Sequence, residues 1–173
     1  MMTENQPSVS SVALKYGLIG ALVSVVFTAA LLIAGVEVNG WIGSLGYLIL
    51  IGAMVIAMKE YKKSNYGYMS YGQGLGIGTL ISLFFGVLGG VFMYIYTSFI
   101  DPNYTSSMMD KQRIELEERG MSDEQIDQAI AMGESFSSPV MMIVWSIVGY
   151  LFIGFILSLI VAAIMKHKRP EFE

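Results

Sequence analysis

The chain has 173 residues, of which 54% are hydrophobic and only 14% are charged. A soluble domain carries about 25% charged residues, so the composition indicates a membrane protein instead. The sequence contains no cysteine, which excludes disulfide bonds, thiol catalysis and cysteine-ligated metal sites.

Four stretches without a charged residue divide the chain, at residues 16–36, 38–58, 64–100 and 135–165. The two shortest hold 21 residues each. A helix of that length, at about 1.5 Å per residue, is about 31 Å long and matches the hydrocarbon core of a bilayer. We therefore predict an all-α integral membrane protein, a four-helix bundle in a membrane domain at residues 11–165. The predicted spans are residues 12–34, 41–58, 73–99 and 139–165.

The first half of the chain predicts two antiparallel spans and a basic patch. Residues 1–10 are polar, and we expect them to form a loose cytoplasmic tail. The link at residues 35–40 is short and rich in turn-forming residues, so the first two spans should be antiparallel neighbours. A basic patch at residues 59–63 follows the second span. Residues 64–71 contain three tyrosines and few aliphatic side chains, which is typical of a membrane interface.

The third predicted span carries small residues at every fourth position: Gly74, Gly78, Ser82, Gly86 and Gly90. Residues four apart lie on one face of a helix, so these side chains would form a smooth groove about 24 Å long. The backbone of another helix can approach closely at such a face. We expect the groove to pack within the bundle. The alternative is that it forms a homodimer or receives the helix of a partner.

The polar segment at residues 103–138, between the third and fourth spans, predicts a helical hairpin. Its first helix should cover residues 106–119 and end at Gly120, because glycine is favoured just after a helix. The second should begin at Ser122, whose side chain can form a capping box with Gln125. The hairpin is acidic and has a narrow apolar stripe, so we expect it to rest on the membrane surface or on a partner.

The charges between the spans predict the orientation of the chain. With four crossings, seven of the ten lysine and arginine residues lie on the same side as both termini. Ten of the fourteen aspartate and glutamate residues lie on the opposite side, with the hairpin. Because basic loops stay in the cytoplasm, we expect cytoplasmic termini, including the basic tail at residues 166–173, and an extracytoplasmic hairpin. The expected location is the cell membrane.

The sequence contains no recognisable catalytic or metal-binding arrangement. Ionisable residues deep in a membrane usually mark ion paths or proton relays, and none lies deep in a predicted span. The single histidine, His167, lies in the basic tail. The carboxylates of the hairpin are interspersed with lysine and arginine, as on an ordinary solvated helix. We therefore expect no enzyme activity, no catalytic, cofactor or metal site, and no nucleic-acid partner.

A few polar side chains within the spans could line a polar path through the bundle: Gln73, Thr79, Ser82, Thr97 and Ser146. Such side chains more often form hydrogen bonds from one helix to another, and this is the arrangement that we expect. A passive channel is the alternative interpretation of the same residues.

Several short motifs follow one another in a characteristic order along nearly the whole chain. The third span opens with residues 71–74 (YGQG) and closes with residues 94–96 (YIY) and 99–102 (FIDP). The hairpin contains residues 118–126 (ERGMSDEQI), and Pro139 begins the last span. In this order of parts the chain resembles the bacterial membrane proteins catalogued as domain of unknown function 4199. The resemblance implies the four-span layout and assigns no functional residue.

These observations favour a non-enzymatic membrane scaffold or accessory subunit, which would act through helix packing and through its acidic outer hairpin. The alternative is a small oligomeric passive channel or exporter. The expected partners are the lipid bilayer and either a second copy of the chain or another membrane protein.

Overall fold

The computed structural model describes residues 8–36 and 40–168, which are largely helical. The elements are α1 (Val9–Ile33), α2 (Gly40–Ser64), α3 (Tyr71–Ile95), the π-helix η1 (Tyr96–Ile100), α4 (Tyr104–Glu118), α5 (Asp123–Phe136) and α6 (Pro139–Met165). Within these two ranges the chain forms no β-strand, and an isolated antiparallel bridge joins Met69 to His167. The predicted all-α fold is confirmed.

Three of the helices extend beyond the predicted spans. The helix α2 continues through the basic patch to Ser64, and α1 begins at Val9, inside the predicted tail. The helix α3 begins at Tyr71, two residues before the predicted span. Charged residues end an apolar stretch without ending a helix, because lysine stems can lie along apolar surface and cations are favourable in the last helical turn. Parts of the predicted tails and of the first link, at residues 1–7, 37–39 and 169–173, lie outside the described residues.

The contacts divide the chain into two compact units. The first unit consists of Met1–Gly89 and Ile147–Glu173, and the second is Gly90–Ser146. The first therefore contains α1, α2 and the longer parts of α3 and α6. The second contains the remaining ends of α3 and α6 together with η1, α4 and α5.

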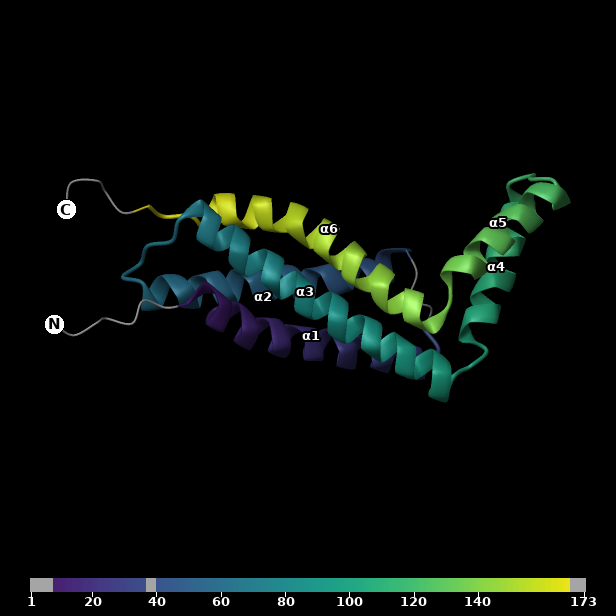
Figure 1. The fold of residues 1–173 in the computed structure, drawn as a ribbon, viewed down its shortest axis with the longest axis horizontal. Helices are drawn as coiled ribbons and strands as arrows, with labels where there is room; N and C mark the ends of the chain where they lie inside the picture. Colours follow the sequence, from purple (N-terminus) through teal and green to yellow (C-terminus); the bar gives the residue numbers. More distant parts are fainter. Residues whose placement is uncertain (1–7, 37–39, 169–173) are drawn as a thin grey trace. The chain divides into compact units, whose positions relative to one another are not determined.

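In the first unit α1, α2, α3 and α6 run side by side (Figure 1). Among the described residues, four helical stretches are long and apolar enough to cross a membrane: Val9–Ile33, Trp41–Ser64, Tyr71–Ile100 and Pro139–Met165. Large apolar side chains such as Leu22 and Phe152 are exposed on these helices, which suits surfaces that contact lipid. The chain is therefore a multi-pass membrane protein.

The core of the first unit is built from one face of each helix. Buried side chains recur every four residues, with Leu50, Met54 and Met58 on α2 and Ile77, Ile81 and Phe85 on α3. The helix α1 approaches through small residues, and a Cβ added to Gly20 would lie 2.8 Å from the Cβ of Ala53. Because lipid tails are as apolar as this core, close packing between helices stabilises the bundle more than the exclusion of water does.

Candidate functional site

Small residues of α3 lie against small residues of α6 in the first unit. The pairs are Gly74 with Ala162, Gly78 with Ser158, and Ser82 with Gly154. Each step of four residues forward along α3 matches a step of four residues back along α6, so the helices are antiparallel and in constant register. We call these three pairs the α3–α6 seam.

The space at the seam is too small for additional side-chain atoms. A Cβ added to Gly74 would lie 2.9 Å from the Cβ of Ala162. A Cβ added to Gly154 would overlap the side chain of Ser82, and one added to Gly78 would overlap that of Ser158. Real Cβ atoms essentially never approach other atoms so closely. The backbones of α3 and α6 can therefore approach each other this closely only because the seam residues are small.

The remaining two residues of the predicted groove, Gly86 and Gly90, are also buried. Gly90 belongs to the second unit, where a Cβ added to it would lie 2.9 Å from the Cα of Ile143 in α6. The structure thus places four of the five predicted groove residues directly against α6 of the same chain. This face of α3 contacts its own chain at those positions.

Two of the hydroxyl groups considered for a polar path form hydrogen bonds within their own helix. The Thr79 hydroxyl donates to the carbonyl oxygen of Leu75 at 2.8 Å, and the Ser82 hydroxyl donates to that of Gly78 at 2.8 Å. The expectation of hydrogen bonds from helix to helix is wrong for these two residues. A serine or threonine in a helix can reach the carbonyl four residues earlier, which satisfies it without a partner helix.

Thr97 lies in the π-helix η1, which the sequence analysis did not predict. Its hydroxyl donates to the carbonyl oxygen of Met93 at 2.8 Å and lies 3.9 Å from the Sδ of Met142. The turn closes where the Asp101 N–H donates to the Tyr96 carbonyl oxygen at 2.8 Å, five residues earlier. No periodicity or capping residue in the sequence distinguishes this wider turn from an ordinary helix end.

The second unit contains the predicted hairpin, formed by α4 and α5. Ile126 of α5 is its anchor, with only 1% of its surface exposed. Arg113 of α4 and Asp127 of α5 form an ion pair of 2.7 Å across the hairpin. The capping box is confirmed, and in it the Ser122 N–H donates to Oε1 of Gln125 at 3.2 Å.

Electrostatic effects in the hairpin follow from these contacts. The hydrogen bond to Asp127 is the main reason that the pKa of Arg113 is raised. Burial is the main cause of the raised pKa of Tyr104, with the nearby Tyr96 adding to it. The rings of Tyr96 and Tyr104 meet edge to face, with centroids 5.5 Å apart.

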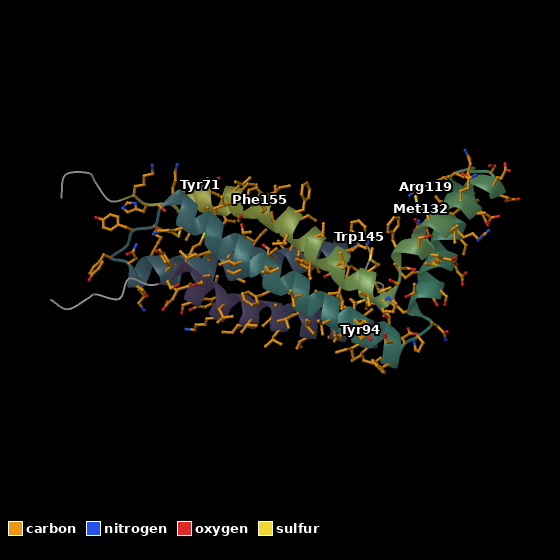
Figure 2. All side chains as sticks on the ribbon, viewed as in Figure 1. Tyr71, Tyr94, Arg119, Met132, Trp145 and Phe155 are labelled. Atoms are coloured by element: carbon orange, nitrogen blue, oxygen red, sulfur yellow. The ribbon has the colours of Figure 1, made fainter. Side chains whose placement is uncertain are left out.

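The outer surface of the hairpin combines carboxylates with exposed apolar side chains. The exposed carboxylates are Asp110, Glu115, Glu117, Glu118, Asp123, Glu124, Asp127 and Glu134. Met132 is 63% exposed and Phe136 is 47% exposed, and they lie one turn apart on α5. Figure 2 shows Met132 and Arg119 among the side chains of this hairpin. Sequence analysis predicted the acidic character but did not identify these apolar residues.

The described part of the chain holds no cluster of metal-ligating side chains. In residues 8–36 and 40–168, no three histidine, aspartate or glutamate side chains come close enough together to hold a metal ion. The ionisable side chains that the structure places therefore offer no ready-made metal centre there.

Comparison with curated proteins and with solved structures gave no match. A family model described as Protein of unknown function (DUF4199) matches residues 15–167, from within α1 to just beyond the end of α6. The motifs at both ends of α3, the hairpin and the start of α6 all lie inside the matched range. Since the match covers far more than half of the sequence, the chain belongs to the family of proteins of unknown function DUF4199.

Proposed function

We propose that this protein is a non-enzymatic membrane scaffold or accessory subunit whose outer hairpin binds another membrane protein. The observation that carries the proposal is the hairpin surface, on which Met132 and Phe136 are exposed among carboxylates. The packing of the seam within one chain supports the same interpretation, because it leaves the hairpin as the more accessible contact surface.

The orientation is part of this proposal. Both termini and the loop between α2 and α3 would lie in the cytoplasm, because the basic residues concentrate there. The hairpin would lie on the outer side of a bacterial cell membrane. A partner would then contact the hairpin through a segment on the outer side of the membrane, and not through a cytoplasmic domain.

The composition of the hairpin surface defines the chemistry of the partner. Residues four apart share one helix face, so Met132 and Phe136 together present a single apolar contact of about one helical turn. Interfaces typically place such apolar and aromatic groups at the centre and polar groups at the rim. The surrounding carboxylates favour a partner that surrounds an apolar centre with lysine or arginine side chains.

Site-specific photocrosslinking in native membranes tests this proposal. A photoreactive amino acid at Met132 of the full-length chain should give a single adduct of defined size. The matched control is Ala131, which is also exposed but lies about 100° around the helix, and it should give little or no adduct.

Equal adducts from positions 131 and 132, or none from either, would contradict the proposed hairpin contact. An adduct with the mass of two chains would instead locate the hairpin at an interface between copies. That result would favour the oligomeric channel, and ion flux through vesicles that contain the purified protein would then test it.

A further inference from the structure

A small open notch lies in the first unit, where the loop between α2 and α3 meets the residues after α6. Its volume is about 270 Å³, and it is lined by Asn65, Tyr68, Met69, Ser70, Gln73, His167 and Lys168. Figure 2 labels Tyr71, the first residue of α3, at this end of the unit. Two segments that are far apart in the sequence therefore build one surface feature.

The walls of the notch are held in place by backbone and ring contacts. The Met69 N–H donates to the His167 carbonyl oxygen at 2.8 Å, and the His167 N–H donates back to Met69 at 2.9 Å. The rings of Tyr68 and His167 stack with centroids 5.5 Å apart. The Asn65 side-chain amide donates to the carbonyl oxygen of Tyr68 at 2.8 Å. The notch is thus preorganised, which lowers the cost of binding a ligand.

The charges at the notch are positive. Lys168 lines it, and outside the lining the ammonium of Lys62 on α2 lies 3.2 Å from the carbonyl oxygen of Met165 at the end of α6. Lys63 and Lys166 are exposed close by in the sequence. Of the described residues that line the notch, none is acidic. An anion would therefore meet one lysine and no carboxylate among the described residues of the lining.

The notch also offers a neutral hydrogen-bond donor. Oε1 of Gln73 already accepts a hydrogen bond from the Ser70 N–H at 2.8 Å, so the NH₂ group is the part of the Gln73 side chain that donates. Two N–H groups at the start of α3 are already used, because the Gln73 N–H donates to the Ser70 hydroxyl at 3.2 Å and the Gly74 N–H donates to the Ser70 carbonyl oxygen at 3.1 Å. A directed donor beside a positive charge suits a phosphate group, which carries several acceptor oxygens.

We propose that this notch binds the phosphate of an anionic phospholipid headgroup. The notch lies at the ends of three spans, where headgroups lie in a bilayer, and its lining includes a lysine and a tyrosine, residue types that are common in that zone. In this arrangement Lys168 supplies the charge, and the side-chain amide of Gln73 supplies a directed donor. The proposal depends on the four-span layout and is independent of the partner proposed for the hairpin.

Native mass spectrometry of the full-length protein in mixed micelles of phosphatidylglycerol and phosphatidylcholine tests the proposal. Measurements in about 0.5 M ammonium acetate reduce attraction between separated surface charges. The protein should bind phosphatidylglycerol in preference to phosphatidylcholine. Lys168→Gln should weaken phosphatidylglycerol binding about tenfold, because a charge-assisted hydrogen bond is lost. Lys63→Gln removes the same charge outside the lining and should change binding less than about twofold.

Three results would overturn the assignment to a lipid. If Lys168→Gln and Lys63→Gln lose phosphatidylglycerol binding equally, the binding reflects general attraction to a basic surface. The same conclusion follows if the protein shows no preference for phosphatidylglycerol over phosphatidylcholine. Displacement of phosphatidylglycerol by millimolar inorganic phosphate would assign the notch to a free phosphate instead. Because Lys168 is an exposed residue beyond the end of α6, its replacement should leave the fold intact, and the thermal unfolding curve checks this.

Discussion

Replacing Gly154 by alanine should lower the free energy of unfolding of the bundle by about 1–3 kcal/mol, the usual cost of overfilling a packed core. The added methyl group would overlap the side chain of Ser82 across the α3–α6 seam. The seam can accommodate it only if the two backbones move apart, which weakens every contact along the seam. Thermal unfolding of the purified protein in detergent, followed by circular dichroism, measures the loss.

Two further variants separate this effect from the general consequences of mutating a glycine. Gly149→Ala lies on the same helix, where an added Cβ meets no atom within 4 Å, and it should be neutral or slightly stabilising. Ser82→Gly alone should cost about 0.5–1 kcal/mol as a glycine inside a helix. Combined with Gly154→Ala, it should recover most of the stability that Gly154→Ala alone loses. In the double variant the glycine lies on α3 at position 82 and faces the larger residue on α6 at position 154. If the losses in the free energy of unfolding from Gly154→Ala and Ser82→Gly simply add in the double variant, the seam is not packed as described.

Replacing Ile126 by alanine should unfold or loosen the hairpin, with a loss of about 2–5 kcal/mol for a buried isoleucine. Ile126 is 1% exposed and is the anchor of a hairpin that has little other core. The loss should be local to α4 and α5, because these helices belong to a compact unit separate from most of the bundle. Hydrogen exchange of the backbone amides of the full-length protein measures this directly, as faster exchange in α4 and α5.

The control for this prediction is Ile114→Ala. Ile114 lies on α4 with 55% of its surface exposed, so its truncation should change the stability of the hairpin by less than about 0.5 kcal/mol. If both variants accelerate exchange equally, Ile126 is not the anchor of the hairpin. If neither does, the packing between α4 and α5 contributes little to its stability.

The features that the sequence predicted well are those encoded by local patterns. Uncharged stretches located the four spans, because a bilayer demands apolar side chains along a whole helix. Ser122 and Gln125 predicted the start of α5, because a capping box involves residues only three apart. The spacing of Gly74, Gly78 and Ser82 indicated a face for close helix packing, since residues four apart share a face.

Other features depend on contacts that no local pattern encodes. The pairing of Met69 with His167 joins segments from opposite halves of the chain. In the sequence Lys62 and Lys168 belong to two separate basic segments, so the sequence alone does not reveal the notch. The hydroxyl of Ser82 could equally have reached a neighbouring helix, and only the structure shows that it bonds to its own. The choice of α6 as the partner of the groove depended on tertiary packing in the same way.

Four crossings should place the hairpin and the basic end of the bundle on opposite sides of a membrane. Because the chain contains no cysteine, single cysteines at Gln128 in the hairpin and at Ser64 at the end of α2 can be labelled without background. A membrane-impermeant maleimide should label position 128 in right-side-out bacterial spheroplasts and position 64 only after the membrane is permeabilised. Labelling of both positions in intact spheroplasts, or of position 64 alone, would contradict this arrangement.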